Sequence, residues 1–128
     1  MQLLKYILYL YKKYWMENQV DVKLMKDAEN FIHDLDSASR EKVFYNIRKT
    51  MMGLKGEWFE KMKGTNDLFE FRTLYNRQYI RLFAFWDTRD NKKTLIICTH
   101  GLIKKTDKTP ASDIHQAEKL KEEYFKTK

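Results

Sequence analysis

Apolar and polar residues alternate most regularly in the middle of the chain, between Leu68 and Trp86. The run reads Leu-Phe-Glu-Phe-Arg-Thr-Leu-Tyr-Asn-Arg-Gln-Tyr-Ile-Arg-Leu-Phe-Ala-Phe-Trp, and aromatic and β-branched residues at a spacing of two are typical of strands. Its two halves are separated by a polar stretch, Tyr75 to Gln78, in which Asn76 tolerates the positive φ of a tight turn. The pattern therefore predicts a β-hairpin.

The two faces of this hairpin fix its register. One face carries the residues that can form a core, namely Phe69, Phe71, Thr73, Ile80, Leu82 and Ala84. If Asn76 and Arg77 form a two-residue loop, these residues meet, and Arg72 lies directly opposite Arg81 on the other, non-core face. Like charges side by side repel each other unless an anion lies between them, which Glu70 or an external phosphate could supply. A solvated face with a local ion pair is the alternative.

The sequence before the hairpin predicts a strand and two helices. Val20 to Leu24 alternates as a short strand would, and the following apolar residues have helical spacing, at Met25, Ala28, Phe31, Ile32 and Leu35. The segment from Asp36 to Ser39 offers N-cap chemistry for a second helix, with an apolar stripe at Val43, Phe44, Ile47 and Met51. Two such helices in succession predict a helical hairpin whose apolar stripes lie against a sheet.

The sequence after the hairpin predicts a central strand and a last helix. Residues Thr94 to Thr99 are almost continuously apolar, as in a buried strand. Thr109 can cap the last helix with Pro110 at its first position, and the buried stripe would be Ile114, Ala117, Leu120 and Tyr124. The expected fold class is α+β, with an N-terminal helical hairpin packed on a small antiparallel sheet and a C-terminal helix.

The composition fits one folded domain. The 128 residues are 43% hydrophobic and 15% aromatic, which is enough for one core. There are 25 Lys and Arg against 18 Asp and Glu, and the net charge of +7 favours a polyanionic partner such as nucleic acid or an acidic protein segment. The lone Cys98 lies in an apolar run and is interpreted as a buried thiol, which fits a reducing cytosol. We therefore expect a cytoplasmic protein.

Residues 1–15 differ from the rest of the chain. They are apolar and aromatic, but they are too short to cross a bilayer, are interrupted by lysines, and are not followed by a small-residue cleavage site. Three interpretations remain: an accessory strand or helix packed on the domain, an amphipathic segment at a membrane surface, or an extension upstream of a true start at Met16. We expect an accessory extension at 1–15 and a single domain at 16–128.

The motifs of several enzyme classes are missing from the sequence. It contains no glycine-rich phosphate loop, His-Glu-x-x-His motif or Cys/His cluster, so nucleotide-fold and zinc enzymes are disfavoured and we expect neither cofactor nor metal. Where the predicted central strand ends, His100 is followed by Lys104, Lys105 and Lys108. A histidine beside lysines would have a lowered pKa and could act as an acid or a base. The alternative is that His100 only hydrogen-bonds the sheet edge.

Three segments precede the final helix in a distinctive order. They are Glu70-Phe71-Arg72, Tyr79-Ile80-Arg81-Leu82-Phe83, and the run from His100 to Pro110, His-Gly-Leu-Ile-Lys-Lys-Thr-Asp-Lys-Thr-Pro. In this order they resemble the RelE/ParE superfamily of toxins from toxin-antitoxin systems, and most closely its HigB-like, phage-associated branch. The resemblance extends roughly from Val20 to Phe125.

The resemblance implies a type II toxin that acts as a ribosome-dependent mRNA endoribonuclease and inhibits translation. RelE-type members cleave mRNA in the ribosomal A site without a metal, by driving the 2′-hydroxyl onto the adjacent phosphate. By resemblance, Arg72 and Arg81 would hold the phosphate and stabilise the transition state, Lys104 would assist them, and His100 would be the acid or base. The implied RNA-binding residues are Lys61, Lys63, Tyr79, Lys105 and Lys108. The implied partners are an antitoxin, of helix-turn-helix type, the ribosome and mRNA, with no membrane.

The sequence departs from the RelE pattern at one position. RelE-type toxins use a tyrosine in the C-terminal segment. The only tyrosine in that segment of this chain, Tyr124, falls on the predicted buried stripe of the last helix. The general acid and base therefore stay open. Two other functions also stay open: a ParE-like inhibitor of DNA gyrase that performs no chemistry, and an inactive relative that binds DNA or an antitoxin.

Overall fold

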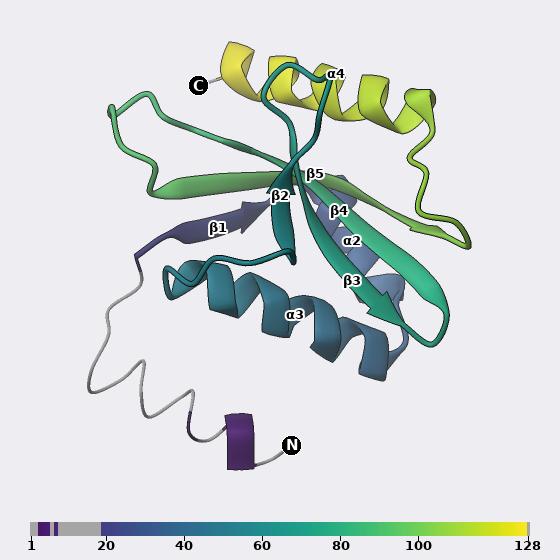
Figure 1. Cartoon of the computed structure of the whole chain (residues 1–128). Coiled ribbons are helices and arrows are strands. Elements are labelled where there is room, and N and C mark those ends of the chain that lie inside the picture. Colours follow the sequence, from purple (N-terminus) through teal and green to yellow (C-terminus); the bar gives the residue numbers. More distant parts are fainter. Residues whose placement is uncertain (1–2, 6, 8–18, 128) are drawn as a thin grey trace.

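The structure is a computed structural model that describes residues 3–5, 7 and 19–127 of the chain. The elements are β1 (Asp21–Leu24), α2 (Lys26–Asp34), α3 (Ser37–Met51), β2 (Phe59–Lys61), β3 (Phe69–Tyr75), β4 (Gln78–Trp86), β5 (Leu95–Lys104) and α4 (Ala111–Thr127). The strands form one sheet in the order β1-β5-β4-β3-β2. Figure 1 shows α2 and α3 on one face of this sheet and α4 on the other. The predicted α+β class is confirmed.

Two details of the sheet differ from the prediction. Strand β1 pairs with β5 in parallel, with Asp21 opposite Leu95, whereas every other pair of neighbouring strands is antiparallel, as expected. The short edge strand β2 lies in a segment where the sequence analysis predicted no strand. Both deviations are at the edges. Of the central strands, β3 and β4 follow the prediction, whereas β5 continues to Lys104, past the Thr99 at which the sequence predicted its end, so His100 and Lys104 lie within the strand.

The β3–β4 hairpin has the predicted register. Asn76 and Arg77 form its two-residue loop, and both have positive φ, 51° and 61°, as the tight turn of a two-residue hairpin requires. Phe71 pairs with Leu82, and Arg72 pairs with Arg81. The core between this sheet face and helices α2 and α3 contains, among others, Phe71, Ile80, Leu82, Ala28, Ile32, Val43 and Ile47.

The two N-terminal helices are joined as a hairpin by polar side chains. The Asp36 side chain caps α3 by accepting a hydrogen bond of 2.7 Å from the backbone N–H of Ser39. The Arg40 guanidinium donates to the backbone carbonyls of Ile32, His33 and Leu35, which lie at the C-terminal end of α2. The carbonyl groups that this helix end leaves unpaired are therefore satisfied by its neighbour.

Strand β5 contains an irregularity that positions His100. Leu82 pairs with Gly101 and Ala84 pairs with Cys98, so two residues of β5, Thr99 and His100, oppose the single Phe83 of β4. Gly101 is needed here because a Cβ at this position would lie 2.0 Å from the Phe31 ring of α2. The bulge leaves the His100 ring beside Phe83, with the ring centroids 4.7 Å apart.

The sheet face that carries the arginines is not the open surface that the sequence indicated. Leu68, Phe83 and Phe85 of this face are fully buried, and Leu68 and Phe83 form a second core with Met62 and with Ala117 of α4. Helix α4 begins at Ala111, one residue later than predicted. The face could not be recognised as a core because its burial comes from α4, far along the chain.

The predicted N-terminal extension lies mostly outside the described residues. Among those that are described, Lys5 forms an ion pair with Glu41 of α3. The division into an extension at 1–15 and a domain at 16–128 stays a prediction. In the described part of the chain, no helix is both long enough and apolar enough to cross a membrane.

Candidate functional site

The alternation of the strands gathers charged residues at one end of the face covered by α4. Arg72 of β3, Arg81 of β4 and Leu102 of β5 form one row across the sheet, and Tyr79 and Lys104 are paired in the next row. Cross-strand neighbours share a face, so both arginines and Lys104 point to the same side. With Glu70 and Asp107, which contact both arginines, we call these residues the arginine cluster; its members are Glu70, Arg72, Arg81, Lys104 and Asp107.

The two arginines differ in exposure, which corrects the expectation that both lie on an exposed face. The Arg81 side chain is only 3% exposed, whereas the Arg72 side chain is 31% exposed. Arg72 also forms an ion pair of 3.0 Å with Glu60 of the edge strand β2. A buried guanidinium is stable only when anions and hydrogen bonds compensate its charge. The carboxylates around the pair supply that compensation.

Glu70 lies on the buried side of the cluster. Its Oε1 is 3.6 Å from the Nε of Arg72 and 3.6 Å from the Nε of Arg81, which is too long for a hydrogen bond. The Oε2 of Glu70 and both Nε atoms are buried without a hydrogen-bond partner. Burial raises the pKa of the Glu70 carboxyl and outweighs the opposing effect of the arginines. The carboxyl therefore balances the two charges without being locked by hydrogen bonds.

Asp107 lies on the solvent side of the cluster, in the loop between β5 and α4. Arg81 Nη2 donates to its Oδ1, and Arg72 Nη2 donates to its Oδ2 at 3.4 Å. The hydrogen bond from Arg81 lowers the pKa of Asp107. Lys104 Nζ donates to the Asp107 backbone carbonyl and to the Thr109 hydroxyl, at 2.9 and 2.7 Å. Burial and the neighbouring Arg81 lower the pKa of Lys104.

A shallow cavity borders the arginine pair. The Arg81 guanidinium lies 5.4 Å from the centre of the Tyr79 ring, so this predicted RNA-binding tyrosine does lie beside the predicted phosphate-binding residues. Leu74, which pairs with Tyr79, is 65% exposed. The cavity is lined by Asn46, Glu57, Trp58, Arg72, Thr73, Leu74, Tyr79 and Arg81. Its combination of apolar and cationic groups suits a nucleotide, whose base is apolar on its faces and whose phosphate is anionic.

His100 is engaged elsewhere on the same face. Its Nε2 is 3.2 Å from Asp113 Oδ1 in the first turn of α4, and the residue is 8% exposed. Burial lowers the pKa of His100, against the opposing effect of Asp113 and Asp27. The recess beside it is lined by Asp27, Asn30, Phe31, Gly101, Ser112, Asp113 and Gln116 as well as His100. Within the described part of the chain, no recorded contact joins His100 to either arginine, so the structure does not unite it with the cluster.

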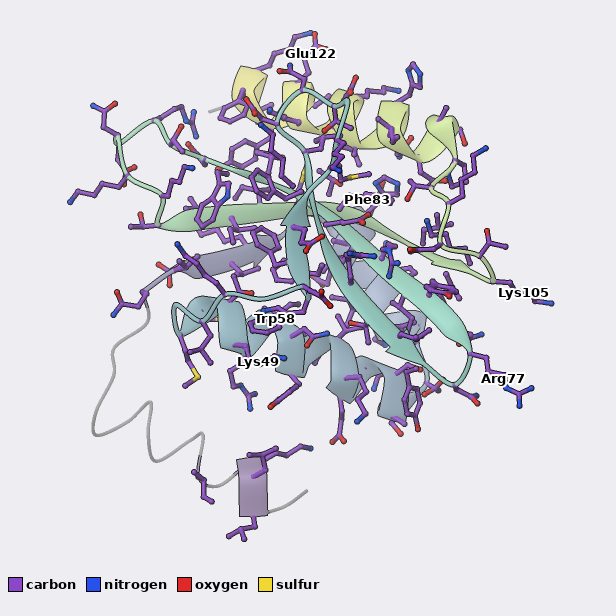
Figure 2. The ribbon with its side chains drawn as sticks, viewed as in Figure 1. Lys49, Trp58, Arg77, Phe83, Lys105 and Glu122 are labelled. Carbon is purple, nitrogen blue, oxygen red and sulfur yellow. The ribbon has the colours of Figure 1, made fainter. Side chains whose placement is uncertain are left out.

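The predicted RNA-binding lysines divide into two groups. Lys105 and Lys108 are exposed and flank Asp107 in the β5–α4 loop. Figure 2 shows the Lys105 side chain directed away from the fold, at the same end of the sheet as Arg77 in the hairpin loop. Lys61 pairs with Phe69, which places it on the opposite face from the arginines, and its Nζ is 3.0 Å from Asp67. Lys63 is exposed in the loop that follows β2.

Two acidic residues that contact the arginines, Asp107 and Glu60, were not recognised as site residues from the sequence. Asp107 belonged to the quoted lysine-rich run but had no assigned role, and its position as the only acidic residue between Lys104 and Pro110 was the available signal. Glu60 had no signal, because strand β2 was not predicted. Metal binding has no structural support among the residues described, which contain no group of three or more His, Cys, Asp or Glu placed to hold an ion.

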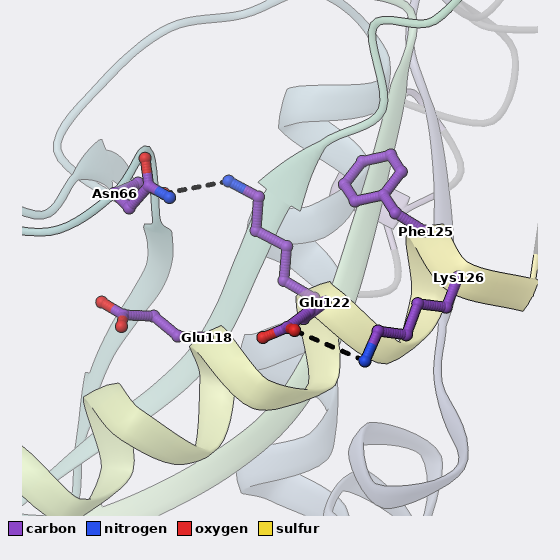
Figure 3. Close-up of a pocket in the computed structure, with 6 residues that line it drawn as sticks. Asn66, Glu118, Glu122, Phe125 and Lys126 are labelled. Atoms are coloured by element: carbon purple, nitrogen blue, oxygen red, sulfur yellow. Dashed lines mark hydrogen bonds and ion pairs between the residues drawn. The ribbon is translucent and has the colours of Figure 1, made fainter.

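A second cleft, between α4 and the loop that follows β2, is a weaker candidate (Figure 3). It is lined by Asn66, Glu118, Lys121, Glu122, Phe125 and Lys126. Its charges are mixed and partly paired, since Lys126 Nζ lies 3.5 Å from Glu122 Oε1 and Lys121 Nζ donates to the Asn66 carbonyl. It lacks the convergence of cations seen in the arginine cluster.

Comparison with known proteins supports the predicted family. Residues 30–122 match the family model "Phage derived protein Gp49-like", and this segment includes the whole arginine cluster. No curated protein matches the chain.

Two solved structures are similar in fold. An arginine-to-alanine double variant of the E. coli toxin RelE in the free state has a TM-score of 0.57 at 17% identity, covering 79% of this chain and 96% of that chain. The RelBE2 toxin-antitoxin complex from Mycobacterium tuberculosis gives a TM-score of 0.53 at 12% identity, covering 70% of this chain and 97% of that chain.

Proposed function

Because the chain belongs to the Gp49-like family of phage-derived proteins and has the fold of RelE toxins, we propose that it is the toxin of a toxin-antitoxin system. We further propose that it is a metal-independent endoribonuclease that cleaves mRNA on the ribosome. The first proposal is supported by the family and the fold. The second is supported by the chemistry of the arginine cluster.

The observation that carries the proposed reaction is the facing pair of Arg72 and Arg81, with Lys104 in the adjacent row. Attack of a ribose 2′-hydroxyl on the neighbouring phosphate adds negative charge to the phosphate oxygens. Guanidinium groups offer donors in a planar fork that matches these oxygens, and fixed donors stabilise developing charge because they need not reorganise during the reaction. Arg81, held in place by burial, suits this role.

Proton transfer requires groups whose pKa is shifted towards the working pH. Two members of the cluster meet this condition: burial raises the pKa of Glu70, and burial with the neighbouring Arg81 lowers the pKa of Lys104. We assign the base role to Glu70, which lies between the two arginines, and the acid role to Lys104 in the adjacent row, whereas His100 contacts Asp113. Tyr79, Lys105 and Lys108 would bind the RNA on either side of the reacting phosphate.

The proposed partners follow from the same function. An antitoxin would cover the cationic end of the sheet, and a toxin-antitoxin complex is known for the M. tuberculosis protein of similar fold. The ribosome and mRNA would be reached in the cytoplasm.

The test replaces single arginines by glutamine and maps mRNA 5′ ends in a ribosome-containing translation extract. Arg72→Gln and Arg81→Gln should each lower the cleavage rate by about 100-fold or more, as the loss of a transition-state donor does. Arg77→Gln is the matched control, because Arg77 lies in the loop of the same hairpin but outside the cluster. Thermal melting of each variant separates loss of function from loss of fold, which matters for the buried Arg81.

The outcomes distinguish the functions. Breaks within translated codons that both cluster variants lose and the control keeps support the nuclease. Full cleavage in a folded Arg72→Gln or Arg81→Gln variant would rule out the assigned roles. Intact mRNA accompanied by DNA damage in expressing cells would instead indicate a gyrase inhibitor.

A further inference from the structure

The solvent side of the arginine pair is already occupied by a carboxylate of the chain itself. One Asp107 oxygen accepts from Arg81 and the other accepts from Arg72. A phosphodiester would bind in the same arrangement, with each of its two non-bridging oxygens accepting from a different guanidinium group. Asp107 thus occupies the position where the proposed substrate group must bind.

The position of Asp107 differs from that of the other carboxylate in the cluster. Glu70 is 14% exposed and lies on the sheet itself, whereas the Asp107 side chain is 55% exposed and belongs to the loop from residue 105 to residue 110. An anion that arrives from solvent can displace Asp107 by a movement of this loop alone, without disturbing the core. Glu70 cannot be displaced in this way.

The loop is held over the arginines by Lys104. Its Nζ donates hydrogen bonds to the Asp107 carbonyl and to the Thr109 hydroxyl, so one ammonium group holds the loop on both sides of Lys108. Partly exposed ion pairs and hydrogen bonds of this kind contribute little net stability in water. The contacts that hold Asp107 are therefore weak enough to be replaced by contacts with a phosphate, which is also an anion and has more acceptor sites.

We infer that Asp107 is an internal substitute for the RNA phosphate, which occupies the arginine pair in the free protein and is displaced when RNA binds. The inference rests on the proposed function, since it takes the arginine pair as the phosphate site. It adds a regulatory step, because RNA must compete with the chain's own carboxylate for the arginine pair. Binding of free RNA is therefore weakened, and RNA at a site that supplies further contacts to the protein is favoured. Displacement would also release Lys104 from the loop and make its ammonium available to the substrate.

The test measures binding of a 2′-O-methyl single-stranded RNA oligonucleotide, which lacks the 2′-hydroxyl needed for cleavage, to the purified full chain by fluorescence anisotropy. Asp107→Asn should lower the Kd by about fivefold, because the neutral amide competes poorly for the guanidinium groups. Asp34→Asn is the matched control: it makes the same change in net charge on the exposed end of α2 and should change the Kd by less than about twofold. Melting curves confirm the fold of each variant.

A double-mutant cycle with Arg72→Gln gives the second measurement. Arg72 is partly exposed, so this background avoids removal of the buried guanidinium. The gain from Asp107→Asn should become smaller in the Arg72→Gln background, because the competing contact is then already reduced. Equal effects of Asp107→Asn and Asp34→Asn, or weaker binding by Asp107→Asn, would overturn the inference. Unchanged RNA binding by Arg72→Gln alone would instead contradict the phosphate site of the proposed function.

Discussion

At the scale of one residue, Glu70 shows how an ionisable group in the arginine cluster can cost stability. Its carboxyl is held between two guanidinium groups at distances too long for hydrogen bonds, and burial raises its pKa. A raised pKa in the folded state means that the ionised carboxylate is less favourable there than in the unfolded chain. The chain thus retains, between two guanidinium groups, a carboxyl group that costs stability at neutral pH. Natural proteins accept such costs at functional sites.

Replacement of Glu70 by glutamine should therefore affect stability in a pH-dependent way. Below the ordinary pKa of 4.5 the carboxyl is protonated in both states, and the native stability of the wild type carries no ionisation cost. As the pH rises through the raised folded pKa, the wild type loses stability that Glu70→Gln retains. Urea unfolding at about pH 4.5 and at pH 7 measures the free energy of unfolding of both proteins. The difference between Glu70→Gln and the wild type should shift in favour of the variant at the higher pH.

The experiment on Glu70 has a control variant and an outcome that would contradict the prediction. Glu60→Gln is the control, because Glu60 contacts Arg72 from the exposed edge strand. A difference between Glu70→Gln and wild type that is independent of pH, or that favours the wild type more at pH 7, would contradict the assigned effect of burial on Glu70.

For single residues, the sequence predicts the cross-strand neighbours better than the degree of burial. The Arg72–Arg81 pair was predictable because strand alternation and a two-residue loop allow only one register that buries the phenylalanines. The burial of Arg81 was not predictable, because strand alternation gives the face and the cross-strand neighbours of a residue but not its exposure. The bridging contact of Asp107 was not predictable either, since it depends on the path of an irregular loop.

Helix α4 is the element that determines whether this face of the sheet is a core or a surface. It is tied to the sheet near both of its ends: Asp113 in its first turn contacts His100 of β5, and the Tyr124 hydroxyl donates a hydrogen bond of 2.7 Å to Asp87, just after β4. Arg89 and Tyr124 together hold the pKa of Asp87 well below its usual value. The Tyr124 ring also packs against Phe85, so Tyr124 lies on the side of α4 that faces the sheet, as predicted, but it is half-buried rather than buried.

Removal of the Tyr124 hydroxyl should loosen the C-terminal attachment of α4. Tyr124→Phe keeps the ring contacts and leaves Asp87 paired with Arg89, so we expect a loss of about 1 kcal/mol in the free energy of unfolding. Tyr45→Phe, on the half-buried part of α3, is the matched control and should stay within about 0.5 kcal/mol of the wild type. Urea denaturation followed by circular dichroism measures both. A Tyr124→Phe variant as stable as the control would show that this hydrogen bond does not hold α4.

The elements themselves were predictable to different degrees, for physical reasons. Helices α2, α3 and α4 have apolar stripes long enough to be recognised, and β5 begins with a continuous apolar run from Leu95 to Cys98. The polar continuation of β5 to Lys104 has no such pattern, so it was not predicted as strand. Strand β2 has only three residues, too few for alternation to be informative. The parallel pairing of β1 is a property of chain topology, since the direction of an edge strand follows from the path of α2 and α3 rather than from its own residues.

At the scale of the whole molecule, the charge of +7 is less informative than its distribution. Arg72, Arg81 and Lys104 share one sheet face, and Lys105 follows Lys104 in the chain as an exposed residue of the β5–α4 loop. Lys61 is on the opposite face and is paired with Asp67. Both lysines belong to the implied RNA-binding set, but the fold separates them. Only the lysine beside the cluster is placed to contact a strand of RNA whose phosphate lies between the arginines.

The salt dependence of RNA binding can decide between these lysines. For single-stranded nucleic acid, each neutralised phosphate contributes about −0.7 to the slope of log K against log salt concentration. Lys105→Ala should therefore weaken binding of the 2′-O-methyl oligonucleotide and reduce the steepness of the slope by about 0.7. Lys61→Ala removes the same charge from the other face, so it should lower affinity only slightly and leave the slope unchanged. If Lys61→Ala flattened the slope as much as Lys105→Ala, the RNA would have to cross both faces of the sheet, and the arginine cluster could not be the centre of its binding site.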